Sequence, residues 1–308
     1  MTIACPTMRL ASGSIGYRDS GGKGMPILFI HGVCGSKEVF EHQFTAPLTD
    51  MFRLIAFDLP GHGASEDAAH PAEGYSIRAL TNISVDVMNY LRLKQALVVG
   101  WSLGGHIAME LMARFPERLA GAVAIGAPPL APGRLAPMRA FHVHKGMLLG
   151  RKARFTTRDA ERWQELCYGP EPDGMHFAAI LRADGRMRPE TTRSLLRGGI
   201  ADQRRVVATS PVPLALINGA DDPIMRVKYL EKLAYANLWE ERSHLIAGAG
   251  HAPFLSHPNS FNVLLHRFAS DMARRFPAPY LIEKGQAPLS PSAFGHAAAP
   301  KSPRRAAR

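Results

Sequence analysis

Ser102 lies at the centre of the sequence Gly100-Trp-Ser-Leu-Gly104, which has the pattern G-x-S-x-G. The motif directly follows the apolar run 96–100 and directly precedes a helical pattern over 103–115. A sharp turn from a buried strand into a helix holds a serine hydroxyl above the sheet, and small flanking residues let strand and helix approach. This context indicates a nucleophile elbow. The alternative is a glycine-rich helix start in which Ser102 only caps the first turn.

A serine nucleophile needs a base nearby, and an elbow of this kind predicts the chain order serine, acid, histidine. Among the 13 histidines, His251 is singled out because it follows the last predicted strand, 245–247, in a loop of small residues. Asp221 and Asp222 follow the strand predicted before that one. We favour Asp222 as the acid because Pro223 biases its backbone towards extended geometry, whereas Asp221 can bond within its own turn.

The backbone N–H groups of Val33 and Leu103 are the predicted oxyanion donors. Leu103 opens the helix after the elbow, where the helix dipole favours negative charge. Val33 follows the first predicted parallel strand, where the second donor of such sites resides. We interpret His31 as a hydrogen-bonded structural imidazole, and His62 and His106 as packing or turn residues. The sequence has no HExxH, no CxxC pair and no phosphate-binding glycine loop, so we expect neither a metal nor a cofactor.

The elements that must position these groups follow an alternation of strand and helix. Short apolar runs end in turn residues and lead into helical patterns, and they cover 25–30, 52–57, 96–100, 121–125 and 212–217. Such uninterrupted runs are typical of strands buried on both faces, and therefore of a mostly parallel sheet covered by helices. The sequence therefore predicts a doubly wound α/β core.

The alternation lapses between 128 and 208, a stretch rich in Arg and interrupted by Pro and Gly. We predict that 128–208 fold as a helical cap inserted into a core made of 1–127 and 209–276. Three apolar cap residues, Met147, Phe155 and Trp163, are candidates for lining a substrate groove; the alternative is that they form the cap's own small core. Residues 277–308, without periodicity and rich in Pro, Ala, Ser and Arg, are predicted to form a disordered basic tail.

The composition is that of a globular protein, with 308 residues, 46% hydrophobic and 20% charged. The net charge of +11 comes without a nucleic-acid-binding motif, so we interpret it as solvated surface and expect no nucleic-acid partner. No run of 18 apolar residues occurs, and we expect no membrane insertion. The three scattered cysteines, Cys5, Cys34 and Cys167, form no disulfide framework and favour a cytoplasmic location.

These motifs resemble the α/β-hydrolase superfamily over nearly all of 1–276. The residues that carry the resemblance are His31-Gly32, Asp58-Leu-Pro-Gly-His-Gly63, Gly100-Trp-Ser-Leu-Gly-Gly105, Asp222 and Gly250-His251. Shorter similarities at 100–106, 183–186, 237–239 and 249–254 resemble the bacterial N-acyl-homoserine lactonases of this fold. The resemblance implies Ser102 as nucleophile, Asp222 as acid, His251 as base and the N–H groups of Val33 and Leu103 as oxyanion hole.

Three positions depart from the lactonase pattern. The chain has Asp222 where those enzymes have Glu, Val33 where Asn follows the His-Gly pair, and Trp163 where a cap tyrosine lies over the pocket. The expected activity is hydrolysis of a lactone or carboxylic ester through an acyl-enzyme, with N-acyl-homoserine lactone ring opening favoured. A carboxylesterase acting on open-chain esters by the same triad stays open, as does a non-catalytic small-molecule receptor on this scaffold.

Overall fold

The computed structural model describes residues 6–45, 47–132, 136–142, 145–170, 174–196 and 199–282. Within these ranges one sheet of eight strands has the order β1-β2-β4-β3-β5-β6-β7-β8. The strands are β1 (Thr7–Leu10), β2 (Gly13–Asp19), β3 (Pro26–Ile30), β4 (Arg53–Phe57), β5 (Ala96–Trp101), β6 (Leu119–Ile125), β7 (Leu214–Gly219) and β8 (Leu238–Ile246). Strands β1 and β2 pair antiparallel, and the pairs from β4 to β8 are parallel. The predicted mostly parallel sheet is confirmed.

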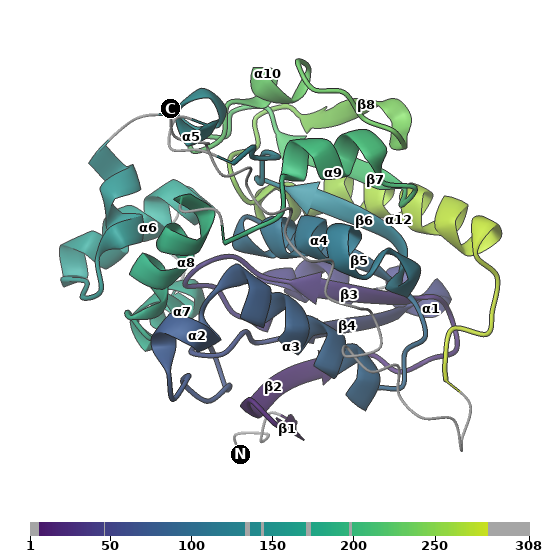
Figure 1. The fold of residues 1–308 in the computed structure, drawn as a ribbon, viewed down its shortest axis with the longest axis horizontal. Helices are drawn as coiled ribbons and strands as arrows, with labels where there is room; N and C mark the ends of the chain where they lie inside the picture. Colours follow the sequence, from purple (N-terminus) through teal and green to yellow (C-terminus); the bar gives the residue numbers. More distant parts are fainter. Residues whose placement is uncertain are drawn as a thin grey trace, which may run out of the picture.

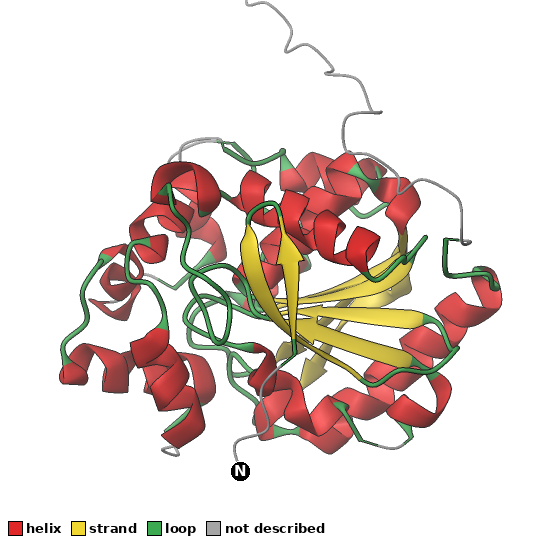
Figure 2. Cartoon of the chain, turned by 90° about the horizontal axis from the view of Figure 1, so that it is seen from below, coloured by secondary structure: helices red, strands yellow, loops and turns green. Residues whose placement is uncertain are grey.

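The five predicted apolar runs all became strands, and four of them, β3, β5, β6 and β7, are buried along their whole length. Alternate residues of a strand face opposite sides of the sheet. In β3, Leu28 and Ile30 pack into one core with α3 (Ile77–Tyr90) and α4 (Leu103–Arg114). Ile27 and Phe29 pack into the other core with η1 (Lys37–Gln43) and α12 (Pro258–Arg275). Helices therefore cover both faces (Figure 2).

The last strand differs from its predicted extent. We expected only 245–247, whereas β8 covers Leu238–Ile246 at the edge of the sheet. Several of its side chains, among them those of Glu240 and Glu241, are partly or fully exposed. An edge strand keeps polar residues on its open side, so it lacks the continuous apolar run that reveals a central strand.

A group of helices is inserted in the chain between β6 and β7. They are α5 (Ala136–Ala140), η3 (Lys145–Arg151), α6 (Thr157–Tyr168), α7 (Gly174–Arg182), α8 (Met187–Leu196) and α9 (Gln203–Thr209). Figure 1 shows α6, α7 and α8 together on one side of the sheet, whereas α9 lies beside α4. The remaining short elements are α1 (Leu48–Met51), α2 (Pro71–Gly74), η2 (Pro116–Arg118), α10 (Val227–Leu230) and α11 (Pro253–Ser256).

The chain beyond α12 stays on the core for six residues more than expected. Leu281 pairs with Leu93, the N–H of Ile282 donates to the carbonyl of Arg92 at 2.8 Å, and that of Lys94 donates to Tyr280 at 2.7 Å. The expectation of disorder from 277 is thus wrong for 277–282, because backbone pairing with 92–94 is invisible in composition. The rest of the predicted tail, 283–308, lies outside the described residues. No helix in the described ranges is long and apolar enough to span a bilayer.

Candidate active site

Ser102 occupies a strained turn between β5 and α4. Its φ of 53° and ψ of −112° lie in a region that side chains rarely adopt. The turn is tight because a Cβ on Gly100 would lie 2.1 Å from the Gly104 carbonyl, and one on Gly104 would lie 2.0 Å from that of Ile30. The Ser102 N–H donates to the carbonyl of Ile125 on the neighbouring strand at 2.7 Å. The local structure is that of the elbow expected from the motif.

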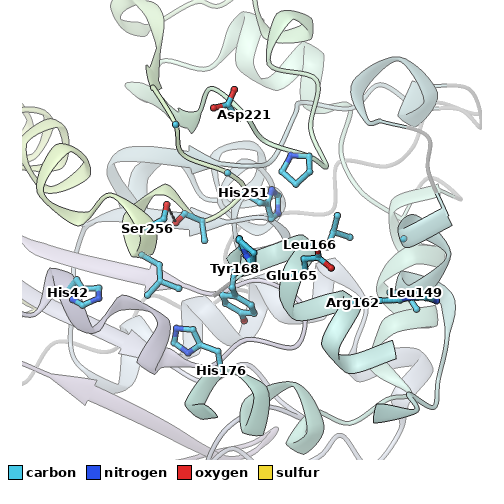
Figure 3. Close-up of a pocket in the computed structure, with 18 residues that line it drawn as sticks. His42, Leu149, Arg162, Glu165, Leu166, Tyr168, His176, Asp221, His251 and Ser256 are labelled. Carbon is cyan, nitrogen blue, oxygen red and sulfur yellow. Dashed lines mark hydrogen bonds between the residues drawn. The ribbon is translucent and has the colours of Figure 1, made fainter. Parts of the chain in front are cut away.

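Asp222 and His251 form a buried hydrogen-bonded pair. The His251 Nδ1–H donates to Asp222 Oδ2 at 2.8 Å, and both side chains are almost inaccessible to solvent. The other carboxylate oxygen, Oδ1, accepts the N–H groups of Ile224 and Met225 at 2.7 and 2.9 Å. Burial opposes ionisation of the carboxyl, but His251 and the two N–H groups hold the pKa of Asp222 below its usual value. The contact with the imidazole is therefore made by Asp222, and Asp221 lies apart from His251 (Figure 3).

The ring of His251 lies against the strand end that follows β6. A Cβ on Gly126 would be 2.5 Å from His251 Cε1, and the residue before Gly126 accepts the Ser102 N–H. Trp101 Nε1–H donates to the His251 carbonyl at 2.8 Å, which ties the histidine loop to the residue before the serine. His251 Nε2 is buried and makes no hydrogen bond within the described part of the chain, with Ser102 or any other group. Nε2 is therefore the ring nitrogen that is available to accept a hydrogen bond from a hydroxyl group.

Val33 and Leu103 line the same cavity as Ser102. The loop before Val33 passes close to the serine, since a Cβ on Gly32 would lie 3.1 Å from that of Ser102. Over the described ranges, the N–H groups of Val33 and Leu103 have no backbone or side-chain acceptor. Two free backbone donors beside a serine are suited to a developing oxyanion.

His31 is hydrogen bonded on both ring nitrogens, as its interpretation as a structural imidazole requires. Nδ1–H donates to the Gly32 carbonyl at 2.7 Å, and Nε2 accepts the Leu59 N–H at 3.0 Å. Burial lowers the pKa of His31 to about 4, so the ring is neutral near pH 7. His31 therefore shapes the loop that carries Val33.

The cavity beside Ser102 has a volume of about 310 Å³ and mostly apolar walls. Of the three cap candidates, Trp163 lines it. Phe155 does not: its ring packs behind Trp163, 5.9 Å between centroids, and lies 3.6 Å from the guanidinium of Arg188. The arginine stacks on the face of the Phe155 ring and so holds it in this place. No local sequence pattern predicts such a contact. Met147 belongs to η3, and its side chain lies outside the described residues.

Comparison with known proteins places the chain in a family. A family model described as "alpha/beta hydrolase fold" matches residues 25–258. The chain belongs to the alpha/beta hydrolase family. The hydrolase is similar in structure to the N-acyl homoserine lactonase AidH complexed with N-butanoyl homoserine, with a TM-score of 0.85 and 35% identity, over 90% of this chain and 100% of that one.

Esterases are also among the similar proteins. A putative aryl esterase from Burkholderia cenocepacia has a TM-score of 0.73 and 26% identity, over 88% of this chain and 100% of that one. The pimeloyl-[acyl-carrier protein] methyl ester esterase of Serratia marcescens is 28% identical over 251 residues, which are 79% of this chain and 92% of the relative. The chain is thus a hydrolytic enzyme related to esterases and to a lactonase.

His106 is a cavity residue that the sequence reasoning missed. It lies on α4, one turn after Ser102, and lines the cavity instead of only packing the core. Its Nδ1 is 2.9 Å from Oε1 of the buried Gln203 on α9. A spacing of four residues puts two side chains on the same face of a helix, and this was the signal available in the sequence.

A second hollow lies beside His251. It has a volume of about 1050 Å³ and is lined by His251, Asp221, Glu165 and Arg162 together with apolar side chains such as Leu166 (Figure 3). Leu166 also lines the smaller cavity. His251 thus lines this larger, more polar hollow, whereas Ser102 lines the smaller apolar cavity.

Cys34, next to Val33, is not arranged as a nucleophile. Its thiol is buried and accepts a hydrogen bond from Arg188 Nη1 at 3.1 Å. Burial raises the pKa of the Cys34 thiol although Arg188 opposes this effect, so the reactive thiolate is scarce at neutral pH. No group of His, Cys, Asp and Glu side chains in the described part of the hydrolase could hold a metal ion.

Proposed function

We propose that this hydrolase opens lactone rings through an acyl-enzyme on Ser102, with N-acyl-homoserine lactones as substrates. The observation that carries the proposal is the 2.8 Å contact between His251 and Asp222, with Nε2 of the same ring left for a hydroxyl. A strained serine and two free N–H groups share one cavity nearby. These are the parts that acyl transfer by a serine requires.

In the proposed mechanism Ser102 Oγ attacks the ring carbonyl while His251 Nε2 takes the hydroxyl proton. Asp222 holds the imidazole and stabilises its positive charge. The N–H groups of Val33 and Leu103 stabilise the oxyanion. The tetrahedral intermediate then breaks its bond to the ring oxygen, which takes the proton from His251 and becomes an alcohol. Water, activated by His251, hydrolyses the serine ester and releases the ring-opened acid.

A lactone sets a special demand on the second half of this mechanism. The alcohol leaving group stays attached to the acyl-enzyme, so ring closure competes with water for the ester. Rapid attack by water is therefore the step that must be favoured.

The choice of substrate is supported by similarity and by the cavity. The lactonase that shares 35% identity with this chain is complexed with N-butanoyl homoserine, a ring-opened compound, and a mutant of it is complexed with N-hexanoyl homoserine lactone. An apolar cavity of about 310 Å³ has room for a short acyl chain. Trp163 supplies one aromatic wall of this cavity in our proposal. Degradation of such lactones would make the enzyme a quencher of quorum signals.

Hydrolysis of open-chain esters is the second candidate. The similarity to an aryl esterase and to a methyl ester esterase favours it, and the chemistry at Ser102 would be the same.

The proposed location is the cytoplasm, because Cys34 and Cys167 are both free thiols.

Mass spectrometry of the products from a matched panel tests the proposal. The panel contains N-butanoyl- and N-hexanoyl-homoserine lactone, γ-caprolactone and p-nitrophenyl butyrate, each with the native enzyme and with Ser102→Ala. We expect ring-opened acids with the native enzyme and only the spontaneous rate with Ser102→Ala. Cleavage of the p-nitrophenyl ester without any ring-opened product would favour the carboxylesterase. No turnover of any member, together with binding of a lactone, would favour a receptor.

A further inference from the structure

The pair formed by His106 and Gln203 fixes which ring nitrogen of His106 carries a proton. Gln203 Oε1 accepts the backbone N–H of Leu130 at 3.2 Å, so this atom is the amide oxygen. An oxygen can only accept, and the 2.9 Å contact therefore requires a proton on His106 Nδ1. The Gln203 amide is oriented further by Nε2–H, which donates to the His106 carbonyl at 3.3 Å. His106 Nε2 is consequently an unprotonated acceptor.

This acceptor belongs to the cavity that holds Ser102. His106 lines the cavity and is only 3% exposed, and its Nε2 has no partner among the described residues. Burial lowers the pKa of His106 to about 4, with Gln203 opposing this effect, so the ring stays neutral at working pH. A neutral imidazole tied at Nδ1 presents one fixed lone pair.

Other polar side chains line the cavity, and the hydroxyl oxygens among them can also accept a hydrogen bond. Thr191 and Thr192 donate their hydroxyl protons to the carbonyls of Met187 and Gly150, at 3.0 and 2.7 Å. The indole Nε1–H of Trp163 and the guanidinium of Arg151 can only donate. A hydrocarbon chain in this cavity would leave the His106 lone pair buried without a partner, which costs binding energy.

We propose that His106 Nε2 accepts a hydrogen bond from a donor on the acyl part of the substrate and thereby selects substrates that carry one. The donor is either the amide N–H of an N-acyl lactone or a hydroxyl on its acyl chain, because both offer the proton that an unprotonated imidazole needs. His106 is thus a specificity-determining residue, and Gln203 positions it. The inference rests on the proposed reaction at Ser102, which takes place in the same cavity.

The test compares selectivity in native enzyme, His106→Phe and His106→Gln. Phenylalanine keeps a planar ring without an acceptor, and glutamine restores an acceptor oxygen. The substrates are N-hexanoyl-homoserine lactone, its 3-hydroxyhexanoyl analogue and an α-hexyl-γ-butyrolactone, which has neither donor. We expect His106→Phe to lower the ratio of kcat/KM for donor-bearing over donor-free lactone by about tenfold, and His106→Gln to recover part of it.

The pattern of losses identifies the donor. If the ratio falls for both N-acyl lactones, the amide N–H is read; if it falls only for the 3-hydroxy compound, the chain hydroxyl is read. Thr191→Val is the matched comparison, because it removes another acceptor oxygen that lines the cavity, and we expect it to leave the ratio unchanged. Equal losses on all three lactones with His106→Phe would reduce His106 to a packing role and overturn the proposal, as would an unchanged ratio.

A pair of esters separates this inference from the proposed function. p-Nitrophenyl 3-hydroxyhexanoate and p-nitrophenyl hexanoate differ only in the hydroxyl, and neither is a lactone. If no lactone is opened but the ester ratio still falls in His106→Phe, lactone hydrolysis is wrong and the role of His106 stands. If lactones are opened and neither the lactone nor the ester ratio depends on His106, lactone hydrolysis stands and the proposed role of His106 is wrong.

Discussion

Asp222 is held by three donors, and this explains why one of two adjacent carboxylates is suited to orient a base. Oδ1 takes the N–H groups of Ile224 and Met225, which leaves Oδ2 aimed at His251. Asp221 uses its backbone N–H to bond the carbonyl of Ala249 and lines the open hollow. Adjacent residues of one loop thus differ in role because of backbone direction.

We expect Asp222→Asn to lower kcat by about four orders of magnitude while the fold is kept. The amide can keep the backbone contacts at Oδ1, but it cannot stabilise the imidazolium that forms when Ser102 gives up its proton. Asp221→Asn is the control and should change kcat little. The measurement is steady-state kinetics on one ester, with circular dichroism to confirm folding. Equal losses in both variants would contradict the assignment of Asp222.

Three buried histidines make folding sensitive to acid. Burial lowers the pKa of His31, His62 and His106 to about 4, about 3 and about 4. In the unfolded chain an imidazole takes up its proton near pH 6.5, so the unfolded state binds more protons below that pH and stability falls as the pH drops towards 4.

We expect the free energy of unfolding to be lower at pH 4.5 than at pH 7 by about 2 kcal/mol for each of these histidines. Urea unfolding at a series of pH values measures the slope. His106→Phe should remove one titrating proton and flatten the curve by about a third. The same slope in native and variant protein would mean that the folded state protonates His106 as readily as the unfolded chain does.

Among the elements, the central strands could be predicted from the sequence, whereas the structure at the edges of the sheet and at the end of the fold could not. The five predicted runs became β3 to β7, because burial on both faces leaves almost only apolar residues in them, with Arg53 in β4 and Asn218 in β7 as exceptions. The predicted extent of β8 was too short because many of its side chains are exposed and polar. The pairing of 277–282 with 92–94 could not be predicted from composition. The elbow at Ser102 was readable because its glycines are required by close backbone approach.

The lining of the cavity depends on contacts between elements that are far apart in the chain. Local sequence patterns do not predict such contacts. Arg188 on α8 donates to the carbonyls of Lys152 and Ala153 and to Cys34 Sγ, and it stacks on Phe155. It therefore joins the inserted helices to the loop that carries Val33. Such a buried arginine holds Phe155 away from the cavity, which corrects the sequence-based expectation for that residue.

Gly126 tests how closely the strand end after β6 fits the histidine loop. Its φ is +60°, and an added Cβ would lie 2.5 Å from His251 Cε1. We expect Gly126→Ala to displace the ring and lower kcat/KM about a hundredfold. Gly150→Ala in the same cavity is the control, since its Cβ would meet only Thr192 Oγ1 at 3.8 Å. Kinetics and thermal melts of both variants make the comparison, and native activity in Gly126→Ala would contradict this geometry.

At the scale of the whole molecule, the sheet brings together residues that are far apart in the chain. Ser102, Asp222 and His251 follow β5, β7 and β8, and Val33 follows β3, so all four lie at the carboxyl ends of parallel strands. The inserted helices then close the apolar cavity with Trp163 and Leu166. This convergence could be predicted from chain order, whereas the shape of the cavity required the packing of the insertion.

The segment 277–282 anchors the end of the fold. A chain that stops after Phe276 loses the buried side chain of Ile282 and the hydrogen bonds to Arg92 and Lys94. We expect it to be less stable than a chain that stops after Ile282 by about 3 kcal/mol. Urea unfolding of the two truncated proteins measures the difference. Equal stabilities would show that this pairing contributes nothing to the fold.

The most direct test of Ser102 as nucleophile and His251 as its base is the rate at which a fluorophosphonate labels the enzyme, with the modified residue found by peptide mass spectrometry. We expect a single adduct on Ser102, formed about a hundredfold more slowly in His251→Ala, because the base must remove the hydroxyl proton. An adduct on another residue, or labelling of Ser102 at the same rate without His251, would contradict these roles.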